Sequence, residues 1–247
     1  MALKTTFNYS PNFNSKKRNS KQIKFIVFHY TGMKNESGTL NRLTDIQSEV
    51  SCHYLIKNNG EIIEIVPDLY VAWHAGSSSW KNYKSLNKNS IGIEITNPGH
   101  NFGYKNFSKK QISSLIKLSK NLIKKYKIDS KNILGHSDIA PERKKDPGEK
   151  FPWEHLSKNK IGLWHMLKKK ELIKNRNLSL DKSKEELFLK NLSKIGYLKK
   201  TPKKLKKEFY LKDLIKTFQR RFRQELIDGK IDRECLLIST NLLKKFN

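Results

Sequence analysis

Short runs of β-branched and aromatic residues, separated by longer polar and amphipathic stretches, constrain the fold most. Residues 23–30 (IKFIVFHY) and 91–96 (IGIEIT) have the composition of short, buried strands. Residues 132–135 form a third, shorter apolar run that leads into a loop rich in polar residues and proline, 135–148. Strands of this kind are stable only when other elements cover them. We therefore expect a sheet with helices packed against it.

A hairpin signal and a helix signal support this expectation. Asn58-Asn59-Gly60 separates two apolar runs, 54–57 and 61–66, and predicts a β-hairpin. Ser108 is followed three residues later by Gln111, which is the capping-box pattern of a helix start. Apolar residues then recur at helical spacing as far as residue 126. The sequence predicts an α/β domain over 21–166, with a mixed central β-sheet flanked by helices.

The remainder of the chain divides into an arm, a linker and a helical domain. Residues 1–20 are polar and indicate an extended N-terminal arm, and the Lys-rich segment 167–180 suits a linker. Three helical patterns follow within 181–247, and we expect them to form a small three-helix domain. The helical patterns cover residues 185–195, 211–222 and 235–246, the last one preceded by the turn Asp228-Gly229.

The composition is that of a globular protein with an unusual charge. Hydrophobic residues make up 36% of the chain and aromatic residues 10%, which suffices for a packed core. No segment approaches the roughly 20 apolar residues of a membrane span. We see no secretory signal in the first twenty residues and expect a cytoplasmic protein. Cys52 and Cys235 are expected to be free thiols of a reducing compartment.

The net charge of +28 raises the alternative of a nucleic-acid-binding protein. The lysines are scattered and mixed with Asn and Ile, and they form no single block. The aromatic residues lie in apolar strands and helices, and no known nucleic-acid module is recognisable. We therefore expect no specific nucleic-acid partner. Weak, steeply salt-dependent and sequence-blind DNA binding would identify any such binding as a by-product of charge.

Three residues could hold a metal ion. His29 closes an apolar strand, where a polar ring must find a partner or a metal. His136 follows the run 133–135, and Asp146 comes ten residues later. Two histidines and one carboxylate leave the fourth tetrahedral position open, as a catalytic zinc requires. Their spacing matches no local zinc motif, so ordinary packed or surface histidines remain the alternative at this point.

Two charged residues could perform chemistry beside such a metal. Glu94 lies in the middle of the run 91–95 and is either a general base facing a cleft or a residue on the solvent face of the strand. Lys144 lies two positions before Asp146, so on an extended loop both side chains point the same way. Lys144 could then stabilise an oxyanion, although one lysine among so many carries little weight alone.

Taken together, the segments resemble the type-2 zinc-dependent N-acetylmuramoyl-L-alanine amidases, the AmpD/AmiD kind. The resemblance covers most of residues 6–165, and it rests on five ordered blocks. The blocks are Ile26-Val27-Phe28-His29-Tyr30-Thr31, Ser51-Cys52-His53-Tyr54-Leu55-Ile56, Ala72-Trp73-His74-Ala75-Gly76, Ser90-Ile91-Gly92-Ile93-Glu94, and Gly135-His136-Ser137-Asp138-Ile139-Ala140-Pro141 continuing through Arg143-Lys144-Lys145-Asp146-Pro147-Gly148.

The C-terminal domain resembles a three-helix peptidoglycan-binding module, a less specific match. It rests on the segment 218–223 (FQRRFR) and on Asp228-Gly229.

The resemblance implies an enzyme that hydrolyses the amide between N-acetylmuramic acid and L-alanine in peptidoglycan or muropeptides. It makes His29, His136 and Asp146 the ligands of one Zn²⁺. Glu94 is implied to deprotonate a zinc-polarised water, and Lys144 to stabilise the oxyanion.

The same resemblance places Tyr54 and His74 in blocks that line the substrate cleft, so both are expected as substrate contacts. His53 is expected to be structural. Position 142 carries Glu where many relatives have a small residue, which puts the local loop shape in doubt but not the ligands.

Two questions stay open at the level of sequence. A catalytically inactive relative that only binds peptidoglycan fragments would be signalled by a missing ligand, and all three are present. The absent signal favours cytoplasmic recycling of muropeptides, whereas a wall-binding module favours polymeric substrate in the periplasm or envelope. The sequence sets no oligomeric state.

Overall fold

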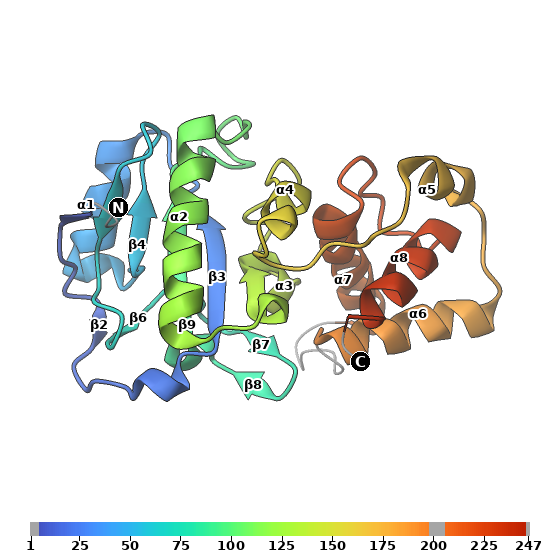
Figure 1. Ribbon diagram of the computed structural model, residues 1–247, viewed down its shortest axis with the longest axis horizontal. Helices are drawn as coiled ribbons and strands as arrows, with labels where there is room; N and C mark the ends of the chain where they lie inside the picture. The colour runs from blue at the N-terminus through green and yellow to red at the C-terminus, as the bar shows by residue number, and fades with distance from the viewer. Residues whose placement is uncertain (1–4, 198–205, 246–247) are drawn as a thin grey trace.

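The computed structural model describes residues 5–197 and 206–245 and builds them around a six-stranded mixed sheet (Figure 1). The strand order is β1-β5-β4-β9-β3-β10, and all neighbours are parallel except β4 and β5, the predicted hairpin. The strands are β1 (Thr6–Phe7), β3 (Phe25–Tyr30), β4 (Tyr54–Ile56), β5 (Ile62–Glu64), β9 (Ser90–Ile95) and β10 (Ile133–Gly135). The predicted mixed α/β fold is confirmed.

The N-terminal arm is extended from residue 5 onward and is part of the sheet structure. β1 pairs with β5 at the sheet edge, and β2 (Phe13–Asn14) pairs with β6 (Val71–Ala72) in a separate two-stranded sheet. A second small sheet joins β7 (Ser79–Trp80) to β8 (Tyr83–Lys84). Residues 1–4 of the predicted arm lie outside the described residues.

Helix α2 (Lys109–Tyr126) covers one face of the six-stranded sheet (Figure 1). The predicted capping box is present, because the Ser108 side chain accepts from the Gln111 backbone N–H and the Gln111 side chain accepts from the Ser108 N–H. Leu115, Leu118 and Leu122 pack against alternate strand residues such as Ile26 and Ile93. Strand alternation then sends the intervening residues to the opposite face.

The opposite face carries α1 (Glu36–Thr44) at one end and a larger apolar core at the other. Leu43 of α1 packs with Leu55 and Ile63 of β4 and β5. Phe25 and Val27 of β3 and Leu134 of β10 belong to the larger core. The sequence analysis did not single out α1, and only two of its nine residues, Thr39 and Leu43, are buried in the structure.

The C-terminal segment forms helices that lie beside α3 (His136–Ile139) and α4 (Trp153–Lys158) (Figure 1). Their buried apolar side chains belong to that larger core. These helices are α5 (Lys169–Asn175), α6 (Lys182–Ile195), α7 (Lys207–Phe222) and α8 (Arg233–Leu243). The last three correspond to the three predicted patterns, although Phe246 lies outside the described residues. The segment 167–180 is not a plain linker, because it contains α5, whose Leu172 is buried. Among the described residues, no helix is long and apolar enough to cross a membrane.

Candidate metal centre and active site

Sheet register places His29 beside Glu94. β3 and β9 run parallel, and His29 and Glu94 are paired Cα partners in that ladder. Both side chains therefore leave the sheet on the same face, the one opposite α2. The His29 Nδ1 lies 3.9 Å from the Glu94 Oε1.

The candidate ligand His136 opens the four-residue helix α3 (His136–Ile139) directly after β10. The sequence predicts a loop at this point, and α3 is a correction of that expectation. The Ser137 backbone N–H donates to the Asp146 carbonyl over 2.9 Å, which ties the start of α3 to the end of the following loop. Gly135 allows this approach, because a Cβ at that position would lie 2.6 Å from the Cδ of Pro147.

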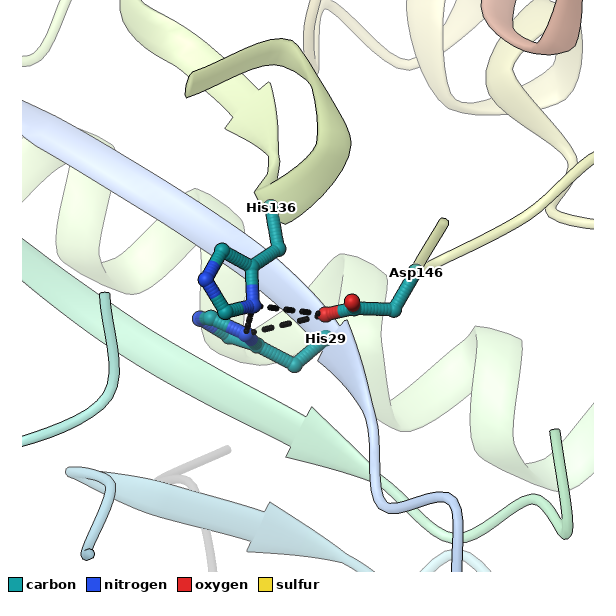
Figure 2. A group of neighbouring side chains, drawn as sticks. All are labelled: His29, His136 and Asp146. Carbon is teal, nitrogen blue, oxygen red and sulfur yellow. Dashed lines mark hydrogen bonds and ion pairs between the residues drawn. The ribbon is translucent and has the colours of Figure 1, made fainter. Parts of the chain in front are cut away.

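Three donor atoms converge at this point (Figure 2). The His29 Nδ1 and the His136 Nδ1 lie 2.9 Å apart, and the Asp146 Oδ2 lies 3.1 Å from the first and 2.9 Å from the second. Ligand atoms about 2.1 Å from a tetrahedral zinc are separated by roughly 3.4 Å. All three side chains are buried, so the cluster fits a metal ion with two nitrogen ligands and one oxygen ligand.

The protonation states also suit a cation. Burial, and after it repulsion by His136, lowers the pKa of His29 to about 4, so its imidazole is neutral near pH 7. Burial alone would raise the pKa of Asp146, but the attraction of His136 and hydrogen bonds with both histidines outweigh it and hold the pKa well below its usual value. Neutral imidazole and ionised carboxylate are the forms that bind zinc.

Glu94 has a largely buried carboxyl, with its side chain 16% exposed, and one of its oxygens has no partner among the described residues. Its Oε2 is buried and has no hydrogen-bond partner within the described part of the chain. Burial, followed by repulsion from Asp146, raises the pKa of Glu94 well above its usual value, while Lys144 partly offsets the effect. A carboxyl with a raised pKa beside a candidate metal site is suited to accept and return a proton.

A cavity of about 660 Å³ lies next to the group formed by His29, His136 and Asp146. Glu94 and Lys144 both line it, together with His136 and Asp146, so the structure brings the predicted catalytic residues to one place. The wall also carries aromatic and cationic side chains that the sequence analysis did not single out: Tyr30, Trp73, Phe102, Arg42, Arg143 and Lys145.

His74 lies behind His29. Its Nδ1 is 3.0 Å from the His29 Nε2, the ring nitrogen that faces away from the cluster, and its own Nε2 is 3.1 Å from the Ser90 Oγ. Its ring packs directly on Gly92. His74 lines the cavity, but its contacts are those of a residue that orients a metal ligand.

Tyr54 is not brought into the cavity. It pairs with Ile93 in the sheet, and its ring belongs to the core under α2. Its hydroxyl donates to the Asp68 Oδ1 over 2.7 Å. This position does not support Tyr54 as a substrate contact. His53, expected to be structural, is fully buried and contacts Arg18.

The comparison with protein families agrees with this geometry. A family model described as N-acetylmuramoyl-L-alanine amidase matches residues 19–149, more than half of the chain. The chain belongs to this amidase family. The matched segment contains His29, Glu94, His136, Lys144 and Asp146.

Known amidases align over different lengths of the chain. The N-acetylmuramoyl-L-alanine amidase AmiD of Escherichia coli is 37% identical over 240 residues, which cover 91% of this chain and 84% of AmiD. The 1,6-anhydro-N-acetylmuramyl-L-alanine amidase AmpD of Haemophilus influenzae is 34% identical over 163 residues, 59% of this chain and 86% of AmpD. The similarity to AmiD therefore extends into the C-terminal helices.

Solved amidase structures show the same extent of similarity. The complex of E. coli AmiD with anhydro-N-acetylmuramic acid-L-Ala-D-gamma-Glu-L-Lys superposes with a TM-score of 0.78 at 35% identity, covering 91% of this chain and 90% of AmiD. AmpDh3 of Pseudomonas aeruginosa superposes with a TM-score of 0.78 at 30% identity, covering 96% of this chain and 97% of AmpDh3. The chain is an amidase with the architecture of these two proteins.

Proposed function

We propose that the chain is a zinc-dependent amidase that hydrolyses the bond between N-acetylmuramic acid and L-alanine in muropeptides or peptidoglycan. The observation that carries the proposal is the convergence of polar atoms of His29, His136 and Asp146 within 3.1 Å of one another, next to a cavity that His136 and Asp146 line. Zinc held by these residues would supply a Lewis acid with one open coordination position.

The remaining chemistry is assigned to residues of the chain. Glu94 accepts the proton of the attacking water at a carboxylate oxygen and returns it to the leaving amine of L-alanine. Lys144, on the cavity wall, offers positive charge to the substrate carbonyl oxygen as that oxygen becomes negative. His74 holds the His29 ring in the orientation that directs Nδ1 at the metal.

The cavity wall favours an acidic peptide linked to a sugar. Arg42, Arg143, Lys144 and Lys145 line the cavity and complement carboxylates, while Trp73 offers a ring against which a sugar can pack. The ligand of the E. coli AmiD complex combines an anhydro sugar with a peptide that includes D-gamma-Glu. We therefore propose a muropeptide of this type as substrate.

The test is to incubate the purified protein with muropeptides and to detect released peptide by mass spectrometry. We expect release by the zinc-loaded protein, loss of release after chelation, and recovery when zinc is added back. Asp146→Ala should abolish both zinc binding and release. Glu186→Ala, at an exposed carboxylate far along the chain, serves as the control and should behave as the parent protein does. A zinc-loaded protein that releases no peptide would refute the proposal.

The compartment stays a prediction. Fractionation of cells that produce the native protein, with immunodetection in each fraction, distinguishes the expected cytoplasmic location from a periplasmic or envelope location.

A further inference from the structure

Two consecutive arginines of α7 extend from the C-terminal helices into the catalytic part of the chain. Arg220 and Arg221 lie in the segment that resembles a peptidoglycan-binding module, yet both side chains are buried against residues of the region 100–153. The contacts of these two arginines lead to the segment that supplies His136 and Asp146.

Arg221 connects α7 to the helix that begins with a metal ligand. Its Nη1 donates to the Asp138 Oδ2, and its Nη2 donates to the Ile133 carbonyl over 3.1 Å. The guanidinium also lies 4.1 Å from the ring centroid of Trp153. Arg221 thus grips both the strand before His136 and the helix that starts there.

Asp138, the partner of Arg221, also bonds to the backbone next to His136. Its Oδ2 accepts the Gly135 backbone N–H over 2.8 Å, which fixes the chain on the N-terminal side of His136. Its Oδ1 accepts a hydrogen bond from the hydroxyl of Tyr197, two residues after the end of α6, over 2.8 Å. A short helix of four residues has few internal hydrogen bonds, so these outside contacts set its orientation.

Arg220 makes a second, separate link to the cavity wall. Its Nε lies 3.6 Å from the Glu149 Oε2, and the same oxygen lies 3.1 Å from the His100 Nε2. The His100 Nδ1 is in turn 2.8 Å from the Tyr30 hydroxyl. His100 and Tyr30 both line the cavity.

A buried ion pair is a poor way to gain stability, because desolvation opposes the attraction and apolar residues of similar volume often do as well. The Arg221–Asp138 pair is nearly inaccessible, with side chains 4% and 1% exposed. What such a pair adds is a fixed, directional contact, since the guanidinium fork accepts only certain placements of its partners. A fixed position for His136 would account for the location of the Arg221–Asp138 pair.

We propose that Arg221 is a positioning residue for the metal centre, acting on His136 through Asp138, and that Arg220 supports the cavity wall. The C-terminal helices then complete the active site instead of forming an independent wall-binding unit. The proposal rests on the zinc site of the proposed function.

The experiment compares Arg221→Met with Arg223→Met in the full-length chain. Arg223 lies two residues further along the chain and forms an equally buried pair, but with Asp232 of the C-terminal segment. We measure zinc affinity by competition with a chromophoric chelator, the kcat and KM of muropeptide hydrolysis, and the thermal midpoint. Arg221→Met should weaken zinc binding by about 10-fold, the low end of the effect of losing a direct partner of a metal ligand, because Arg221 acts through Asp138. Arg223→Met should lower the thermal midpoint but leave zinc affinity unchanged.

Two further variants keep the test decisive. Arg221→Lys retains the charge but not the fork, so it should fold and show a smaller loss of zinc affinity than Arg221→Met. Arg220→Gln should raise KM without changing zinc affinity. Folded Arg221 variants with parental zinc affinity and kcat, or an Arg223→Met variant that loses as much zinc, would overturn the inference. A parent protein that binds no zinc would instead refute the proposed function.

Discussion

Glu94 is the residue in which burial and chemistry conflict most directly. A largely buried carboxyl beside the anionic Asp146 is costly, and the Glu94 Oε2 has no hydrogen-bond partner within the described residues. If the residue at this position only stabilised the fold, an apolar side chain would cost less free energy than an acid. The proton transfer proposed for Glu94 would account for an acid at this position.

Glu94→Gln tests this role. The amide keeps the size of the side chain but cannot accept a proton, so kcat should fall by about 10²- to 10⁴-fold while zinc affinity stays within a few-fold. The measurements are the rate of peptide release and a zinc competition titration. Glu186→Gln, at an exposed position, is the control. A Glu94→Gln variant with the parental rate would remove Glu94 from the mechanism.

Asp68 is a second buried acid, with a structural role and the opposite pKa shift. Its carboxylate accepts hydrogen bonds from Tyr54, Lys125 and Tyr126 at 2.6–2.8 Å. Burial alone would raise its pKa, but the hydrogen bonds from Lys125 and the two tyrosines outweigh burial and lower the pKa below its usual value. A lowered folded-state pKa contributes stability that is present above about pH 4 and is lost as the pH falls through the folded value.

Asp68→Asn should therefore lower the free energy of unfolding at pH 7 by about 1–3 kcal/mol, because the ionised acceptor is lost. The difference between variant and parent should begin to shrink below about pH 4, where the carboxyl of the unfolded chain becomes protonated, and should vanish below the lower folded-state pKa of Asp68. Urea unfolding at several pH values measures both effects. Asp129→Asn is the matched control, since Asp129 is half exposed and Asn keeps its capping acceptor. A difference that does not change with pH would contradict the assignment.

The sequence predicted five candidate site residues: the three metal ligands, Glu94 and Lys144. In the structure the three ligands lie together, and Glu94 and Lys144 line the adjoining cavity. The spacing of these residues in the sequence did not settle their roles, because sheet register decides which of them lie close together. Tyr54 shows the limit of such reasoning. The parallel ladder pairs Tyr54 with Ile93, whose side chain faces α2, and pairs Leu55 with Glu94, whose side chain faces the cavity. Because successive strand residues point to opposite faces, a difference of one position places Tyr54 on the α2 face.

At the scale of elements, β9 combines an apolar face with a face built around the metal site. Ile91 and Ile93 pack under α2, while Gly92 lies under the ring of His74. A Cβ at Gly92 would lie 2.4 Å from the Cγ of His74, closer than any ordinary contact. The glycine is thus required by the position of the histidine that orients His29.

Gly92→Ala should displace His74 and break its contact with His29. We expect zinc affinity to fall by about 10- to 100-fold, since an outer partner of a metal ligand is lost. Ile91→Val is the control on the other face of the same strand, and it should cost about 0.5–1.5 kcal/mol of stability without changing zinc affinity. Zinc titration and urea unfolding of both variants measure these quantities. Equal zinc affinity in Gly92→Ala and the parent would show that His74 does not orient His29.

Elements with a strong local signal were predicted, and elements defined by their surroundings were not. The strands over 23–30 and 91–96, the hairpin and the capped helix α2 all have patterns that can be read without the rest of the chain. Helices α1 and α5 bury few residues, and α3 has only four residues, all of them buried. Such helices are stabilised by tertiary contacts, which a sequence pattern does not contain.

At the scale of the whole molecule, one apolar core joins the sheet to the C-terminal helices. Phe25, Val27 and Leu134 of the sheet belong to the same buried cluster as Phe218 and Phe222 of α7. Trp80 of β7 packs against Tyr197 with ring centroids 4.9 Å apart, and the Lys81 backbone N–H donates to the Gly196 carbonyl over 2.7 Å. The prediction of two domains describes the chain order but understates how much core the two parts share.

The shared core predicts that damage in α7 destabilises the sheet. Phe218 is fully buried, and Phe218→Ala should cost about 3–5 kcal/mol. Because the cluster extends to β3, amide hydrogen exchange in residues 25–30 should accelerate together with exchange in α7, and calorimetry should show one transition at a lower midpoint. Phe209→Ala, on the same helix but 59% exposed, is the control and should change neither. Faster exchange confined to the C-terminal helices, or a second calorimetric transition, would mean that the two parts unfold independently and that α7 does not support the site by sharing its core.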